Sequence, residues 1–331
     1  IYKQKAFSEV YRLFKSLGGR ILWTVHNVSS HEPKHFEQEI ALYQALADLA
    51  DWVHVHHKSV PDATKEFYQI PEEKVLVAEH GNYIDLLPVQ TTQVQCRREF
   101  GIPASATVFL FLGQIRGYKG IDELINAFTD LVKEHKNVWM VIAGKVLGVD
   151  KDEIARKLRA CGNTVFRPGY VPEEEMQLYL GCADAMVLPY RKVLTSGSVF
   201  LALSYSLPVI CPPSGLLSHL VTDGKEGLFF DPEDSNGLAH ALQRFLEVDP
   251  ELRQKMRQQA LETAKAYQWP ESALTLQRHI EGLDFGAVEQ PEIAGNRRHW
   301  FVRGQRKALN GKRCIAIILH YQNIDDTLNC I

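Results

Sequence analysis

Apolar runs alternate with amphipathic stretches along most of the chain. Residues 108–112 and 138–143 form uninterrupted apolar runs, which is typical of strands buried on both faces of a sheet. Residues 120–135, between these runs, carry apolar side chains at helical spacing and predict an amphipathic helix. Strands that alternate with helices in this way predict an α/β fold of parallel βαβ units, with helices on both faces of the sheet.

The alternation occurs in two series, separated by residues 86–95, which have no helical period and predict a linker. The first series predicts helices at 5–17, 35–49 and 60–68 and strands at 20–26, 52–56 and 74–78. The second predicts strands at 108–112, 138–143, 164–166, 185–188 and 208–211 and helices at 120–135, 152–160, 173–181, 198–205, 235–248 and 250–267. Ligands of parallel sheets bind beyond the carboxyl ends of the strands, so we expect the loops there to face one cleft.

Composition narrows the classes of function. The 331 residues are 45% hydrophobic and 23% charged, with a net charge of −3, which gives no global attraction for nucleic acid or an anionic membrane. None of the six cysteines forms a CxxC pair, which argues against a zinc ribbon or disulfide framework and favours reduced thiols. No apolar stretch approaches the ~20 residues of a membrane span, and no signal peptide is visible.

The loop after residues 108–112 is the richest in candidate chemistry. It carries Arg116 and Lys119, contains three glycines that permit close backbone approach, and leads into a helix expected from Gly120. A helix N-terminus with two nearby cations favours a phosphate group. A plain loop with two solvated cations is the alternative, and the spacing alone does not decide between them.

The turn Thr195-Ser196-Gly197-Ser198 before a short apolar helix is a second candidate anion site, although alone it fits a simple helix N-cap better. His26 ends a buried strand, where its imidazole is expected to project toward a sugar hydroxyl or a phosphate. A packed, hydrogen-bonded histidine is the commoner alternative for an isolated position of this kind.

More histidines follow the later strands of the first series. His80 opens the segment His80-Gly81-Asn82-Tyr83, directly after a strand. His54 and His56 would share one face of a strand and lie close to His57. No third ligand stands at a telling spacing, so we interpret them as packed histidines rather than as a metal site.

Taken together, these segments resemble the family-4 glycosyltransferases (glycosyl transferases group 1), which are retaining, nucleotide-sugar-dependent enzymes of GT-B architecture. The resemblance covers about residues 20 to 267 and rests on the order and spacing of TVHN at 24–27, GQIRGYKG at 113–120, the stretch 168–190, SYSLPVI at 204–210 and VTDGKEGLFFDPED at 221–234. It implies two Rossmann-like parallel-sheet domains that face a cleft, with a partial acceptor-side domain at 1–88 and a nucleotide-sugar-binding domain at 89–283.

The resemblance also implies roles for individual residues. Lys119 matches the lysine that contacts the donor diphosphate, and His26 matches the histidine that lines the donor sugar. Gln114 replaces the family's arginine, whose charge Arg116 is expected to take over. His26, Arg116 and Lys119 are therefore the expected catalytic residues. The other expected donor-site residues are Gly113, Gln114, Gly120, Gly144, Lys145, Tyr170, Val171, Thr195, Ser196, Gly197 and Ser198, with Gly169-Tyr170-Val171 flanking the base through backbone groups.

One family motif, the E-x7-E pair, is absent. Counting back from Pro208 places its two glutamates at Val193 and Leu201, and neither residue is acidic. The turn at 195–198 occupies the place of the donor-contacting loop. We therefore expect Ser196, Ser198 and backbone N–H groups to make the ribose and sugar contacts instead.

The resemblance bears on both ends of the chain. In the family a strand and a glycine-rich loop precede the TVHN segment, so we expect an incomplete N-terminal domain here, in a chain that opens at Ile1. Residues 284–312 are rich in Gly, Pro and basic residues and predict a linker. Residues 313–331 resemble the opening strand and helix of a family-2, GT-A-type glycosyltransferase, and an unrelated terminal strand is the alternative.

The resemblance implies a glycosyltransferase that moves a sugar from a nucleotide diphosphate donor to a glycan or lipid-linked acceptor, with retention, in polysaccharide or glycoconjugate synthesis. No metal or cofactor is expected, because Lys119, Arg116 and a helix dipole would stabilise the leaving diphosphate. No nucleic-acid partner is expected. The expected location is cytoplasmic, with peripheral contact at the inner membrane face left open.

The alternatives are a catalytically inactive nucleotide-sugar-binding or scaffolding module and a GT-B nucleotide-sugar 2-epimerase. A dinucleotide-dependent oxidoreductase is disfavoured, since no G-x-G-x-x-G follows a strand.

Overall fold

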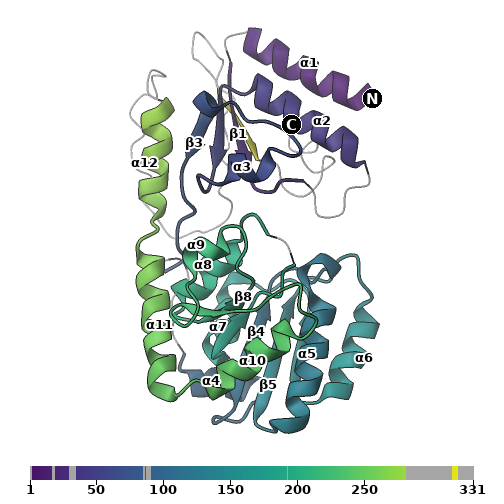
Figure 1. Ribbon diagram of the computed structural model, residues 1–331, viewed down its shortest axis with the longest axis vertical. Helices are drawn as coiled ribbons and strands as arrows, with labels where there is room; N and C mark the ends of the chain where they lie inside the picture. Colours follow the sequence, from purple (N-terminus) through teal and green to yellow (C-terminus); the bar gives the residue numbers. More distant parts are fainter. Residues whose placement is uncertain are drawn as a thin grey trace. The chain divides into compact units, whose positions relative to one another are not determined.

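The computed structural model describes residues 2–16, 19–29, 35–84, 86, 91–191, 193–280 and 315–319. These residues divide into two compact units, each built on its own parallel sheet (Figure 1). The first unit draws on the ranges 1–25, 32–78 and 273–331, and the second on 26–31 and 79–272. The backbone therefore passes from one unit to the other several times, including directly after the first strand.

The first unit has a four-stranded sheet in the order β10-β1-β2-β3. Its strands are β1 (Arg20–Val25), β2 (Trp52–Val55), β3 (Val75–Val77) and β10 (Ile315–Leu319). Its helices are α1 (Tyr2–Ser16), α2 (Phe36–Leu49) and α3 (Val60–Thr64), and it takes the later part of α12 (Trp269–Ile280). Strand β10 pairs with β1 in register from Arg20↔Ile315 to Thr24↔Leu319.

Both faces of β1 are covered. Trp23 lies against Tyr43 of α2 and against Tyr68, with ring centroids 5.8 Å apart in each pair. On the opposite face Leu22 packs with Leu76 of β3 and with Leu276 of α12. This arrangement explains why the sequence of β1 is apolar almost throughout rather than alternating.

The second unit has a six-stranded sheet in the order β6-β5-β4-β7-β8-β9. Its strands are β4 (Thr107–Leu112), β5 (Val138–Gly144), β6 (Thr164–Pro168), β7 (Ala185–Val187), β8 (Val209–Cys211) and β9 (Gly227–Phe229). Its helices are α4 (Gln93–Glu99), α5 (Ile121–Glu134), α6 (Lys151–Cys161), α7 (Glu173–Cys182), α8 (Gly197–Ser204), α9 (Leu217–Leu220), α10 (Gly237–Glu247) and α11 (Pro250–Lys265).

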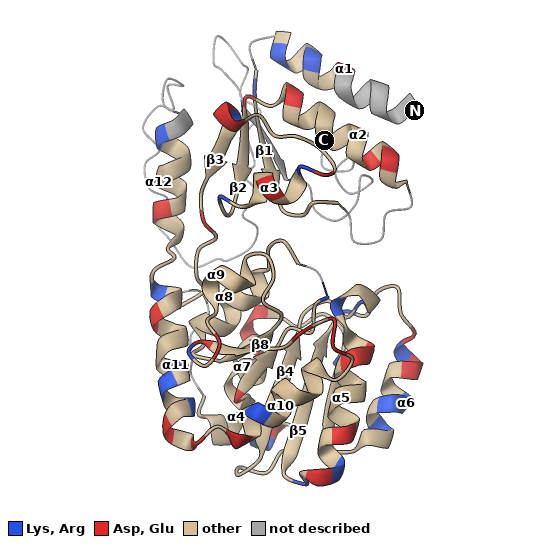
Figure 2. Cartoon of the chain, viewed as in Figure 1, with Lys and Arg blue, Asp and Glu red and all other residues tan. Residues whose placement is uncertain are grey.

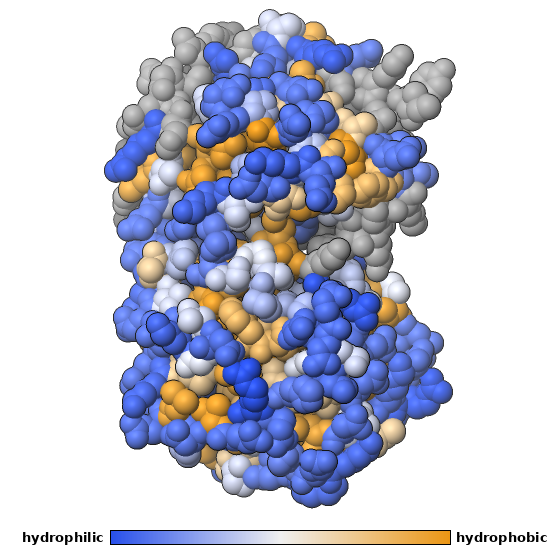
Figure 3. All heavy atoms as spheres, in the orientation of Figure 1, coloured by the Kyte–Doolittle hydropathy of each residue, from blue (hydrophilic) through white to orange (hydrophobic). Residues whose placement is uncertain are grey.

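Alternate residues of β4 belong to different cores. Leu110 packs in a buried cluster with side chains of α7, α8 and α11, whereas Phe109 and Phe111 pack in a second cluster with α5, α6 and α10. In Figure 2, β4 and β5 carry no charged residues, and the charges lie mainly on helices such as α5 and α6. Figure 3 shows hydrophilic residues over most of the visible face, with hydrophobic residues in smaller patches. Helices on both faces confirm the α/β class predicted from the sequence.

The structure corrects several expected boundaries. Helix α4 begins inside the expected linker 86–95, where Thr92 and Gln95 form a capping box that the sequence analysis overlooked. Helix α3 ends at Thr64 rather than at residue 68, because the chain turns there and buries Tyr68 in the core. Gly120 has a φ of 74° and caps α5 instead of forming its first turn.

Some elements were not expected at all, namely α9, β9 and α12. Strand β9 has only three residues, which is too short for a clear pattern. Residues 284–312 lie outside the described part of the chain, and of 313–331 only β10 is described. The incomplete N-terminal domain and the start of a second transferase therefore stay predictions.

Candidate active site at the carboxyl edge of the second sheet

The strand order of the second sheet reverses next to β4. Strands β5 and β6 follow on one side of β4, and β7, β8 and β9 lie on the other. In open parallel α/β sheets the loops at such a reversal diverge to opposite faces and leave a crevice that binds ligands. The loops after β4 and β7 meet this condition, and they are the two segments in which the sequence analysis placed anion sites.

Glycine is required twice in the loop after β4. Gly113 has a φ of 145°, and its N–H donates to the backbone oxygen of Ala143 at 3.0 Å. One 3-10 turn (Gly117–Lys119) leads to Gly120, where a Cβ atom would lie 1.9 Å from the backbone oxygen of Pro189. The loops after β4 and β7 are therefore in direct backbone contact, which no larger residue at 120 would permit.

Two polar side chains converge on Gly113 from these two loops. A Cβ atom placed on Gly113 would lie 3.9 Å from Lys119 Nζ and 3.9 Å from Ser198 Oγ. Lys119 Nζ also lies 5.6 Å from the ring centroid of the buried Tyr190. An ammonium group, a hydroxyl and a half-buried glycine backbone around one point suit the oxygen atoms of a phosphate.

Arg116 and Gln114 interact with each other. Arg116 Nε donates to Gln114 Oε1 at 3.2 Å, and the arginine side chain is half-buried at the start of the 3-10 turn. Gln114 thus orients the arginine that was expected to supply the charge missing at position 114. The contact keeps a second cation, the Arg116 guanidinium, in the same loop as the Lys119 ammonium group.

The three hydroxyl groups of the turn at 195–198 have different surroundings. Thr195 Oγ1 donates to the backbone oxygen of His26 at 2.7 Å, and both residues belong to the second unit. Ser196 is the N-cap residue of α8 but makes no capping hydrogen bond with its side chain. Ser198 faces Gly113 as described above. The turn is therefore more than a simple N-cap, the alternative considered from the sequence.

The remaining expected residues surround this centre at different distances. A Cβ atom on Gly144 would lie 1.7 Å from the backbone oxygen of Gly113, and Gly144 O accepts from Gly169 N at 2.9 Å, so three consecutive strand ends are linked. Val171 is buried, whereas Tyr170 is 78% exposed and Lys145 is also exposed. Lys145 and Tyr170 share this edge of the sheet but are not brought against Lys119.

The positions of the absent glutamate pair hold packing residues. Val193 and Leu201 are both partly buried against the core that includes Leu110. A carboxylate at either place would lose hydration without a cation shown beside it. This explains why apolar residues are compatible with the local structure.

His54 of the first unit is buried and hydrogen-bonded on both ring nitrogens. His54 Nε2 donates to the backbone oxygen of Ala78 at 2.8 Å, so its Nδ1 accepts from Thr24 Oγ1 at 3.2 Å. Burial lowers the pKa of His54 below its ordinary value. Among the described residues, no group of three or more His, Cys, Asp and Glu side chains is arranged to hold a metal ion.

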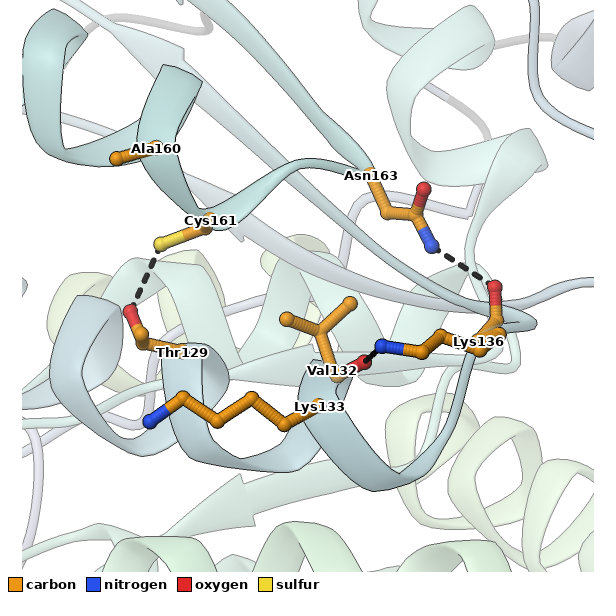
Figure 4. Close-up of a pocket in the computed structure, with 7 residues that line it drawn as sticks. All are labelled: Thr129, Val132, Lys133, Lys136, Ala160, Cys161 and Asn163. Atoms are coloured by element: carbon orange, nitrogen blue, oxygen red, sulfur yellow. Dashed lines mark hydrogen bonds between the residues drawn. The ribbon is translucent and has the colours of Figure 1, made fainter.

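A cavity of about 200 Å³ opens away from this site, where α5 and α6 end (Figure 4). It is lined by Thr129, Val132, Lys133, Lys136, Ala160, Cys161 and Asn163. Its polar groups bond within the chain, as in the 2.7 Å contact between Thr129 Oγ1 and Cys161 Sγ and the bond from Asn163 Nδ2 to Lys136 O. We therefore assign no ligand to it.

No helix within the described ranges is long and apolar enough to cross a membrane.

Solved structures with similar folds include sucrose-phosphate synthase from Thermosynechococcus elongatus, with a TM-score of 0.67 and 21% identity over 79% of this chain and 67% of that one. Another is HepE from Anabaena in complex with UDP and glucose, with a TM-score of 0.69 and 19% identity over 85% of this chain and 75% of that one. At these identities the similarity supports the fold, which is that of GT-B glycosyltransferases.

Curated relatives include a D-inositol 3-phosphate glycosyltransferase of Corynebacterium aurimucosum, 26% identical over 82% of this chain and 66% of that protein. Another is an alpha-D-kanosaminyltransferase of Streptomyces kanamyceticus, 23% identical over 74% of this chain and 67% of that protein. The chain thus spans about two thirds or less of the length of the first relatives it matches.

The family model for glycosyl transferases group 1 matches residues 94–263. This range is just over half of the 331 residues and contains the loops after β4 and β7. The chain therefore belongs to the glycosyl transferases group 1 family.

Proposed function

We propose that this chain contains the donor site of a glycosyltransferase that moves a sugar from a nucleoside diphosphate to a hydroxyl of a glycan or lipid-linked acceptor, with retention. The observation that carries the proposal is the convergence of Lys119 Nζ and Ser198 Oγ on Gly113, at the strand-order reversal of the second sheet. Membership of the family supports the reaction type.

In the proposed reaction the bond between the anomeric carbon and the diphosphate oxygen breaks, and its electron pair goes to that oxygen. Lys119 would stabilise the negative charge as it develops, with Ser198 and backbone N–H groups donating hydrogen bonds. Arg116, oriented by Gln114, would add a second cation. The acceptor oxygen bonds to the anomeric carbon, and its proton leaves with the diphosphate or to solvent. We assign no metal to this step.

The proposed acceptor is less narrowly defined than the donor. The names of the relatives specify inositol 3-phosphate or kanosamine, and at 23–26% identity we carry over only the class of a glycosyltransferase. Retention and a role in polysaccharide or glycoconjugate synthesis belong to the proposal. So does a cytoplasmic location with contact to a membrane face.

The test is calorimetric titration of the chain with UDP, GDP, ADP and their sugars, using the wild type, Lys119→Ala and Lys133→Ala. Lys133 is a matched control because it also lies on the segment 113–134 but pairs with Asp130 at the far end of α5. Loss of a charge-assisted hydrogen bond predicts about 10- to 100-fold weaker binding of one diphosphate by Lys119→Ala. Lys133→Ala should bind like the wild type.

Two results would contradict the proposal. One is a folded wild type that binds none of these ligands, and the other is equal binding by Lys119→Ala and the wild type. Binding of the donor without its transfer or hydrolysis would instead favour the inactive-module alternative.

A further inference from the structure

The segment 79–84, which follows β3, is fixed to helices far away in the sequence. Tyr83 N donates to Ser204 Oγ of α8 at 2.9 Å. Asn82 N donates to Tyr267 O at 2.9 Å, and Asn82 Nδ2 donates to Ala264 O of α11 at 3.0 Å. All of these residues belong to the second unit. This segment is therefore hydrogen-bonded to α8, to α11 and to the residue Tyr267 that follows α11.

His80, in this segment, is held by aromatic contacts on its ring. Its imidazole stacks on Phe200 of α8, with centroids 4.7 Å apart and planes inclined by 14°. Trp269 approaches at the same centroid distance in a tilted orientation. The neighbouring Gly81 leaves room for the indole, since a Cβ atom there would lie 2.4 Å from the Trp269 ring. Offset stacking of this kind adds to area burial and restrains the plane of the imidazole.

The hydrogen bond of His80 defines its tautomer. Nδ1 lies 2.7 Å from the backbone oxygen of Gly81, and because a carbonyl oxygen only accepts, Nδ1 carries the proton. Nε2 is then the acceptor nitrogen of the neutral ring. Burial lowers the pKa of His80, which favours this neutral form at pH 7.

The Nε2 edge of His80 faces the start of α8. A Cβ atom on Gly197 would lie 3.5 Å from His80 Nε2 and 3.4 Å from Tyr83 Oη. Gly197 is the first residue of α8, and the side chain of the N-cap Ser196 does not bond to this turn. An acceptor at this place complements the N–H groups and the positive end of the helix dipole.

We propose that His80 is a positioning residue for the donor loop: its stacked ring and acceptor nitrogen hold the first turn of α8 and thereby place Ser198 against Gly113. This inference rests on the proposed function of the turn at 195–198. In this proposal His80 has no direct role toward the donor. It acts through Gly197 and Phe200, which lie on either side of Ser198 and Val199 in the sequence.

His80→Phe separates positioning from packing, because phenylalanine keeps the stacked ring and removes both nitrogens. Hydrogen exchange of peptides that cover 193–203 and calorimetric binding of the diphosphate preferred by the wild type would be measured. His135→Phe is the matched control, since His135 Nε2 also bonds in this unit, to Gln243 Oε1 at 2.8 Å, but faces α10. Thermal denaturation would verify that both variants are folded.

The expected result is faster exchange at 197–200 and about three- to tenfold weaker diphosphate binding in His80→Phe, with both properties unchanged in His135→Phe. His80→Asn, which retains an acceptor, is expected to recover part of the binding. Unchanged exchange at 197–200 in folded His80→Phe would overturn the inference. If the wild type binds no diphosphate, the proposed function fails, and the exchange measurement alone still decides the role of His80.

Discussion

Thr195 Oγ1 donates a 2.7 Å hydrogen bond to the backbone oxygen of His26, across 169 residues of sequence. Both residues were expected near the donor from the sequence, but no sequence pattern related them to each other. The bond ties the chain directly after β1 to the loop after β7. A hydroxyl that donates to a carbonyl keeps its own acceptor capacity, so Thr195 can still accept a hydrogen bond from a sugar.

Replacing Thr195 by valine is expected to lower kcat/KM for sugar transfer about fivefold, because one hydrogen bond that orients His26 is lost at similar side-chain volume. Thr195→Ser should recover most of the activity, since it restores the hydroxyl. Steady-state kinetics of both variants beside the wild type would measure this. Equal rates for Thr195→Val and the wild type would show that the bond does not orient His26.

Gly120→Ala is expected to lower the free energy of unfolding by about 3 kcal/mol or more. The added Cβ atom would lie 1.9 Å from Pro189 O, and alanine would also have to adopt the positive φ of this position. Gly101→Ala is the matched control. Gly101 has a similar φ of 68°, and a Cβ atom there would have nothing within 4 Å, so only the backbone cost of about 1 kcal/mol applies. Urea denaturation of both variants would compare them, and equal losses would refute the steric argument.

Lys119 and Ser198 are expected to act together on one phosphate group. Ser198→Ala alone should weaken diphosphate binding about fivefold, and the double variant Lys119→Ala/Ser198→Ala should bind more tightly than the product of the two single effects predicts. Calorimetric titration of the four proteins in this cycle would give the coupling. Strict additivity would indicate that the two side chains contact different groups.

The free energy of unfolding is expected to fall as the pH is lowered below about 6.5. The pKa values of His54 and His80 are lowered in the folded protein by burial, so the unfolded chain binds more protons in this range. Stability is therefore greatest above the unfolded pKa and is lost as the pH falls toward the folded values. Urea unfolding at pH 7.5 and 5.5 would measure the loss. It should be smaller in His54→Gln, and a loss equal to that of the wild type would exclude His54 as a cause.

Much of the secondary structure was predictable because it depends on local patterns. The apolar run of β4 and the amphipathic helix α5 were each located to within one residue at both ends. Elements were harder to predict from the sequence where they are short, as for β9, or where the main signal was a single capping box, as for α4. Gly120 was identified as important, but its role as a left-handed cap follows from backbone angles that only the structure gives.

The sequence by itself determined the α/β class, the family resemblance and the two loops that carry candidate chemistry, since periodicity, glycine placement and motif spacing are properties of neighbouring residues. The tertiary structure alone decided the strand order that brings the loops after β4 and β7 together. It also decided the partners of individual side chains, such as Lys119 and Ser198 at Gly113, Thr195 at His26, and His80 at Phe200. These pairs join residues that are far apart along the chain, and their contacts depend on how whole helices and strands pack, which no local pattern encodes.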